Sequence, residues 1–299
     1  MTARDALVKG LKCLGYDDHA IAKLKTKALV KRFRAHFGSS PLDIAEMWCD
    51  LCDGDTVQTK LPAEDENAGG FKRFLHAHYW LFTRPKNRFI SMSHFRLSEK
   101  EVSGKTLWLW IGRISALKAK KIVWHKKIDD SKGPKIILSV DGVDFKTWEP
   151  STGQFNRDPS WCSGKMKASA CRCELAIDVW SSKLVWINGP FKAGSHNDVR
   201  IFKDDLIHKI PTGKKVIADR GYAGLEKCVC IPSTRDAPHV RKFSSRVRCR
   251  HETFNGRIKN FSSMNETWIH GIEKHKMALE AVCVILQYQM DNGSPLFDP

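Results

Sequence analysis

The chain has 299 residues, enough for a sizeable hydrophobic core and for two domains. Its 50 Lys and Arg residues against 33 Asp and Glu residues give a formal net charge of +17, which favours association with a polyanion such as nucleic acid. No apolar run approaches the roughly 20 residues of a membrane-spanning helix, and the first residues lack a signal peptide's apolar stretch. We therefore expect an intracellular protein with no membrane partner.

The first element along the chain is a helical hairpin at residues 27–52. Its apolar residues recur at helical spacing in two runs, Leu29, Phe33 and Phe37, then Leu42, Ala45 and Trp48. The sequence GSSP separates the runs, and Ser40 and Pro41 make a good N-cap and first helical position. Such a pair resembles a DNA-binding helix-turn-helix. Because its second helix is acidic, a purely structural hairpin and a DNA reader both remain open.

The ten cysteines are expected to be reduced thiols inside a cell. Cys49 and Cys52 have the spacing of half a zinc site, but no second pair follows them. We interpret them as core residues.

A boundary between two regions is predicted near residue 130. From residue 71 to 124, aromatic and basic residues alternate at helical spacing, and we expect the aromatic side chains to lie in a core. The polar sequence HKKIDDSKGPK then reads as a linker. Residues 1–130 are thus predicted to form a mainly helical region, and residues 131–299 a second domain.

The second region changes to strands. Residues 136–143, 168–179 and 183–189 read as a first strand and an antiparallel pair, with Ser181 and Ser182 between the paired strands. Residues 195–210 read as one helix, residues 214–219 as another strand, and the segment around Glu252 as a helix. This mixed order predicts an α/β fold, a mixed sheet with flanking helices.

Three acidic residues could converge in this arrangement. Asp141 and Asp219 follow short apolar runs, so each is predicted at or near the end of a strand, and Glu252 lies on the last of these helices. Converging carboxylates repel one another unless a divalent cation neutralises them. Oxygen ligands of this kind suit Mg²⁺ or Mn²⁺. Asp144 is expected to be a solvated loop charge.

Bases surround the last of these acids. Arg248 lies four residues before Glu252 and Lys259 seven after it, so the three share a helix face, and Asn255 adjoins that face. We predict that this helix binds the phosphate backbone. The predicted DNA contacts are Arg248, Arg250, Asn255, Arg257 and Lys259.

Five ordered motifs carry a family resemblance. They are DGVDFKTWEP, VWINGPFKAGSHNDVRIF, IADRGY, RHETFNGRIKNF and KHKMALEAVCVILQYQMDNGSPLF. Together they resemble the DDE-superfamily endonucleases related to Harbinger-like transposases. The resemblance implies a ribonuclease-H-like catalytic domain in which Asp141, Asp219 and Glu252 hold two Mg²⁺ or Mn²⁺ ions. It further implies hydrolysis of phosphodiesters at element ends and joining of the 3′-OH to target DNA.

The resemblance also implies partners and a location. An auxiliary role near the metals is implied for Asp198, with helix capping as the alternative. A nuclear location, a separate Myb-like DNA-binding partner and a homo-oligomer are compatible with the same family. Two rival functions remain open: a domesticated, catalytically silent DNA-binding protein, and a nuclease acting on RNA or a hybrid.

Overall fold

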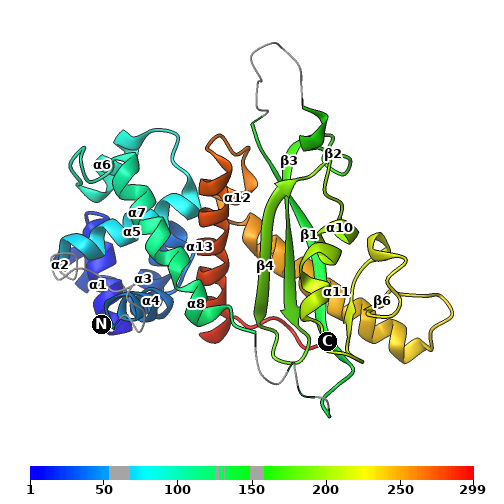
Figure 1. Ribbon diagram of the computed structural model, residues 1–299. Coiled ribbons are helices and arrows are strands. Elements are labelled where there is room, and N and C mark those ends of the chain that lie inside the picture. Colours follow the sequence, from blue (N-terminus) through cyan, green and yellow to red (C-terminus); the bar gives the residue numbers. More distant parts are fainter. Residues whose placement is uncertain (54–67, 125–127, 129, 131, 149–157) are drawn as a thin grey trace. The chain divides into compact units, whose positions relative to one another are not determined.

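The computed structural model describes residues 1–53, 68–124, 128, 130, 132–148 and 158–299 (Figure 1). It divides the chain into two compact units. Unit 1 comprises Met1–Lys121, Asn260–Met264 and Met277–Ser294, and unit 2 comprises Ile122–Lys259, Asn265–Lys276 and Pro295–Pro299. These units are discontinuous in sequence, whereas the predicted regions 1–130 and 131–299 were continuous.

Unit 1 is helical. Its helices from the first part of the chain are α1 (Ala3–Cys13), α2 (Asp18–Ala22), α3 (Thr26–Phe37), α4 (Pro41–Asp53), α5 (Ala68–Thr83), α6 (Arg88–Phe95), α7 (Gly104–Ala116) and α8 (Lys118–Lys121). The helices α12 (Ser262–Asn265) and α13 (Ile272–Asp291) have residues in both units. The later segments join unit 1 through contacts such as the Ser115 hydroxyl donating to Glu280 Oε2 at 2.8 Å. The predicted helical N-terminal region is confirmed.

The predicted hairpin consists of α3 and α4. Ser40 caps α4 as predicted, because its hydroxyl accepts from the Asp43 backbone N–H while its own N–H donates to the Asp43 carboxylate. Acids of α4 have partners inside unit 1: Asp50, for example, accepts from Lys120 at 2.9 Å. Trp48 of the same helix stacks on Trp110 in the aromatic core, with ring centroids 6.0 Å apart. Helix α4 therefore packs within unit 1.

The exposed basic side chains of the hairpin lie on α3. Lys27, Lys31 and Arg34 are exposed and recur at a spacing that places them along one side of this helix. None of the three forms an ion pair with another residue in the described ranges. If the hairpin binds nucleic acid, charge favours α3 as the contacting helix over α4.

Unit 2 is built on a six-stranded mixed sheet. Its strands are β1 (Ile136–Lys146), β2 (Cys162–Ser163), β3 (Ala168–Asp178), β4 (Leu184–Lys192), β5 (Lys215–Ile217) and β6 (Val229–Cys230). The central order is β4–β3–β1–β5–β6, and β2 also pairs with β3. The pairs β4–β3 and β3–β1 are antiparallel, whereas the pairs β1–β5 and β5–β6 are parallel. The predicted α/β class with a ribonuclease-H-like mixed sheet is confirmed.

Helices cover the two faces of this sheet. The helix α10 (Asp198–Asp204) and the 3₁₀ turn η3 (Leu206–Lys209) pack Phe202 and Leu206 into a core with Leu138 and Val140 of β1. The intervening Ser139 instead hydrogen-bonds His251 of α11 (Pro238–Lys259). Successive strand residues point to opposite faces, so α10 and α11 lie on opposite sides of β1.

Two predicted element bounds are wrong. Asp141 lies in the middle of β1 and not near its end, because pairing with β3 continues to Lys146 opposite Ala170. The helix predicted for residues 195–210 begins only at Asp198 and is broken after Asp204, because Asp205 has non-helical backbone angles of φ −133° and ψ −67°. Within the described ranges, no helix is long and apolar enough to span a membrane.

Candidate active site

One pocket in unit 2 receives all three predicted catalytic acids. Asp141 comes from β1, Asp219 follows β5, and Glu252 lies on α11. The pocket has a volume of about 380 Å³. Its lining consists of Ser139, Val140, Asp141, Gly142, Val143, Asp144, Lys165, Met166, Asp219, Arg248, His251, Glu252, Asn255, Gly256 and Lys259. The sheet and α11 thus bring together residues that lie more than a hundred positions apart.

Asp141 points to the α11 face of the sheet, where Asn255 orients its carboxylate. The Asn255 amide donates to Asp141 Oδ2 at 2.8 Å, and its own Oδ1 is buried without a hydrogen-bond partner. We predicted Asn255 as a DNA contact, but in the structure its amide group is bonded to the carboxylate of the first acid. The hydrogen bond fixes one oxygen of Asp141 and leaves Oδ1 to bind another group.

The environment of Asp141 disfavours its charged form. Burial raises its pKa from 3.8 to about 6, Lys165 opposes this increase, and the negative charges of Asp198 and Asp219 add to it. A raised acid pKa means that the folded protein holds the proton more tightly than the unfolded chain does. Without a cation, this group therefore contributes less to stability as the pH rises from about 4 to 6.

This pKa predicts a pH dependence of metal binding. A cation that binds Asp141 would have to displace its proton, so if Asp141 is a ligand we expect Mn²⁺ affinity to fall about tenfold per pH unit below about pH 6. Electron paramagnetic resonance titration of Mn²⁺ between pH 4.5 and 8 measures this. Affinity that stays constant down to pH 5 would contradict the effect of burial on Asp141.

Asp219 and Glu252 are more open to solvent. Asp219 is exposed and caps the short 3₁₀ turn η4 (Arg220–Tyr222), with its Oδ1 accepting from the Gly221 N–H at 2.8 Å. Glu252 is an exposed residue of α11 that lines the pocket. Arg248 and Lys259 of the same helix also line the pocket, so the acids and two predicted phosphate contacts share one site.

Two predicted DNA contacts lie elsewhere. Arg250 is fully buried, and its guanidinium donates to the Val179 carbonyl at 2.8 Å and to the Ser182 hydroxyl at 2.9 Å. It supports the fold, and the prediction that it contacts DNA is wrong for this conformation. Arg257 is half-buried outside the pocket lining and donates to the Pro295 carbonyl at 3.0 Å.

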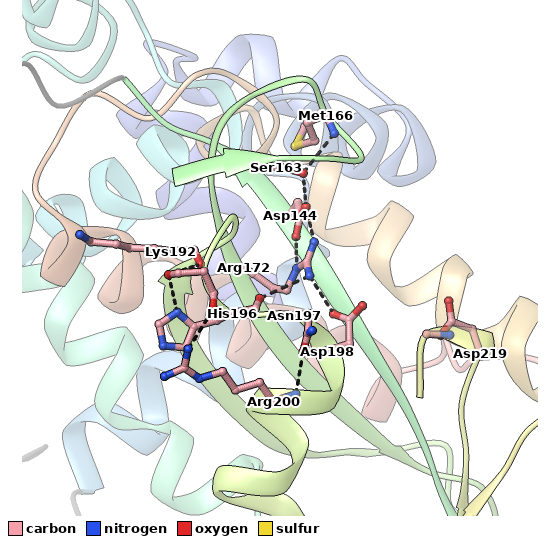
Figure 2. Close-up of polar contacts among 12 residues, drawn as sticks. Asp144, Ser163, Met166, Arg172, Lys192, His196, Asn197, Asp198, Arg200 and Asp219 are labelled. Carbon is pink, nitrogen blue, oxygen red and sulfur yellow. Dashed lines mark hydrogen bonds and ion pairs between the residues drawn. The ribbon is translucent and has the colours of Figure 1, made fainter. Parts of the chain in front are cut away.

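Asp198 lies beside the site on the opposite face of β1. The capping residue of α10 is its neighbour Asn197, whose side chain accepts from the Arg200 N–H at 2.9 Å. The Asp198 carboxylate is 3.5 Å from the Arg172 guanidinium (Figure 2). It also packs so closely on β1 that a Cβ atom at Gly142 would lie 1.9 Å from its Oδ1, so any larger residue at position 142 would displace the Asp198 carboxylate.

Asp144 is buried and paired, contrary to the expectation of a solvated loop charge. Its carboxylate accepts from Arg172 Nε at 2.6 Å and from Nη2 at 2.9 Å. The Ser163 hydroxyl donates to the same carboxylate at 2.5 Å. Asp144 takes part in this network because β1 extends past Asp141, and the alternation of the strand points the Asp144 side chain away from α11 and toward Arg172 (Figure 2).

The donor set suits a divalent cation. Carboxylate oxygens are the ligands that Mg²⁺ and Mn²⁺ prefer, and the negative charge of Asp219 adds to the increase in the Asp141 pKa that burial causes. In the described part of the chain, no three His, Cys, Asp or Glu side chains are grouped tightly enough to hold an ion. Binding by Asp141, Asp219 and Glu252 together would therefore require their side chains to move closer.

The sequence of this region matches a known family. Residues 140–287 match the DDE superfamily endonucleases. The chain therefore carries a DDE superfamily endonuclease domain. The match includes Asp141, Asp219 and Glu252, and nucleases of this superfamily generally use divalent metals and bind DNA. Searches of curated proteins and of solved structures find no match.

Proposed function

We propose that this protein is a metal-dependent DNA endonuclease that acts as a Harbinger-like transposase. It would hydrolyse phosphodiesters at element ends and join the freed 3′-OH to target DNA. The observation that carries the proposal is the pocket in which Asp141, Asp219 and Glu252 lie together with Arg248 and Lys259. Acids alone would repel DNA, whereas acids that hold cations, beside bases, can receive a phosphodiester.

Each side chain has a distinct part in this mechanism. Asp141, Asp219 and Glu252 would hold two Mg²⁺ or Mn²⁺ ions, which supply activation of water and stabilisation of the leaving 3′ oxygen. Asn255 keeps the Asp141 carboxylate oriented through its amide. Arg248 and Lys259 hold the phosphate backbone at the pocket. This reaction needs no covalent enzyme intermediate, so no Ser, Tyr or Cys nucleophile is assigned.

Cleavage assays on three substrates test the proposal. Labelled duplex DNA, RNA and RNA–DNA hybrid of one sequence are incubated with Mg²⁺ or with EDTA. We expect Mg²⁺-dependent strand cleavage of DNA that leaves a 3′-OH. Preferential cleavage of RNA or hybrid would assign the pocket to a different nuclease, and binding of DNA without any cleavage would favour a catalytically silent protein.

One observation favours the silent DNA-binding protein as the second candidate. The three acids are not grouped tightly enough to hold an ion, and Asn255 occupies one oxygen of Asp141. Measurement of Mn²⁺ binding separates the two candidates, since a silent protein of this kind would leave the pocket without affinity for the ion. The family resemblance further supports a nuclear location, a separate Myb-like partner and a homo-oligomer as parts of the proposal.

The pocket bases are expected to set the salt dependence of DNA binding. Replacing Arg248 and Lys259 with Ala should weaken binding to unrelated duplexes and lower the salt slope by about two, one for each lost phosphate contact. The matched control replaces Arg241 and Lys242, which are exposed on the same helix outside the pocket. Fluorescence anisotropy between 50 and about 200 mM salt measures both. Equal decreases in DNA affinity and in salt slope for the two variants would contradict a specific role of the pocket bases.

A further inference from the structure

A third base lines the pocket and has no role in the predicted site. Lys165 lies in the turn that joins β2 to β3, where it is exposed and contributes to the pocket lining. Among the charged groups near Asp141, Lys165 has the largest effect on the pKa of that acid. It lowers this pKa and so favours the carboxylate form. The turn therefore places a cation close to the first acid, from an element other than α11.

The turn that carries Lys165 is held by a buried polar network. The Lys167 N–H donates to the Ser163 carbonyl at 2.9 Å and closes the turn. The Ser163 hydroxyl accepts from the Met166 N–H at 3.1 Å and donates to Asp144, which is clamped by Arg172 (Figure 2). Ser163 and Asp144 are almost completely buried. The base of the turn is thus fixed to β1 and β3, so Lys165 extends from a rigid support.

The neighbouring lysine shows that this placement is specific. Lys167 lies in the same turn and is also exposed, yet it does not line the pocket. Its backbone lies in the left-handed region, with φ at +53°. Of the two lysines, Lys165 alone is therefore placed to act on a group bound in the pocket.

We propose that Lys165 binds a phosphate of the substrate nucleic acid, and that the network of Ser163, Asp144 and Arg172 positions the turn for this contact. This role rests on the proposed nuclease function of the same pocket. Without cations, the Lys165 ammonium offsets the charge of the acids. With the acids neutralised, the ammonium would pair with the phosphate, beside Arg248 and Lys259 of α11 on the same backbone.

The test compares Lys165→Gln with the matched variant Lys167→Gln, which loses the same charge from the same turn. We expect Lys165→Gln to lower the salt slope of DNA binding by about one and to slow single-turnover cleavage by about 10- to 100-fold. Lys165→Arg should restore most of the affinity. Binding of Mn²⁺ alone should be unchanged or tighter in Lys165→Gln, since a nearby positive charge is gone. Lys167→Gln should resemble the wild type in every measurement.

The results separate this inference from the proposed function. If the wild type cleaves DNA with Mg²⁺ but Lys165→Gln keeps its salt slope and rate, the inference fails and the nuclease proposal stands. If the wild type does not cleave, the nuclease proposal fails, and the salt slope still reports whether Lys165 contacts DNA. Ser163→Ala should speed hydrogen exchange of the amides at residues 164–167. It should also reproduce part of the decrease in cleavage rate that is expected for Lys165→Gln. Unchanged exchange would overturn the positioning role of the network.

Discussion

Asp141→Asn, Asp219→Asn and Glu252→Gln are each expected to abolish strand cleavage while leaving DNA binding nearly intact. Each change removes a carboxylate from the pocket without adding bulk and without touching the bases of α11. The loss should appear in kcat rather than in affinity, because the acids serve the reaction and not the phosphate contacts. Single-turnover cleavage and anisotropy on the same duplex measure both.

The three losses should not add. A double variant is expected to be no slower than either single variant, because the acids act as one unit. The matched control is Asp204→Asn, an equally conservative change at an exposed carboxylate outside the pocket, which should leave cleavage unchanged. Cleavage near the wild-type rate by any one of the pocket variants, in Mg²⁺ or Mn²⁺, would remove that residue from the site.

Arg172→Ala is expected to lower the free energy of unfolding by about 3–5 kcal/mol, the usual effect of breaking a buried ion pair. The change leaves the Asp144 carboxylate buried without its two guanidinium hydrogen bonds. Urea denaturation measures the loss. The control is Arg200→Ala, whose ion pair with Asp204 is more than half exposed and should contribute less than about 1 kcal/mol.

A double variant separates lost pairing from lost packing. Adding Asp144→Asn to Arg172→Ala should recover part of the stability, because it removes the uncompensated buried charge. If Arg172→Ala lowers the free energy of unfolding no more than Arg200→Ala does, the buried network is not what holds β1, β3 and the turn before β3 together.

Local sequence patterns predicted most elements of the fold. The apolar runs of unit 2 became β1, β3, β4 and β5, because alternation and β-branched residues are encoded within each segment. The length of β1 was underestimated, since its second half is stabilised by pairing with β3 and carries Gly142 and Asp144. The residues of α13 that join unit 1 were likewise not predictable from local periodicity, because their partners lie far away in the sequence.

The site was likewise predictable only where local sequence patterns determine it. The positions of Asp141, Asp219 and Glu252 in one pocket follow from the order of strands and helix. The hydrogen bond from Asn255 to Asp141 and the position of Lys165 in the pocket lining depend on tertiary packing. No local sequence pattern predicts either of them. Arg250 could have been assigned correctly.

Arg250 lies on the buried face of α11, and the helical pattern shows this. It is three residues after Val247 and four before Phe254, both of which are fully buried. A side chain at that position faces the sheet whatever its charge, and the two terminal nitrogens of Arg250 donate to the Ser182 hydroxyl and the Val179 carbonyl. If the helical spacing of the apolar residues had been given more weight than the positive charge, Arg250 would not have been predicted as a DNA contact.

The most direct test of a metal-dependent nuclease site is the anomalous scattering of Mn²⁺ in crystals of the full chain grown with the ion and a short duplex. We predict an ion about 2 Å from carboxylate oxygens of Asp141 and Asp219, with the Glu252 side chain moved toward the ion and a DNA phosphate beside it. A phosphate bound at Arg248 and Lys259 with no manganese at Asp141 or Asp219 would contradict a metal-dependent nuclease site and identify a DNA-binding pocket without metal chemistry.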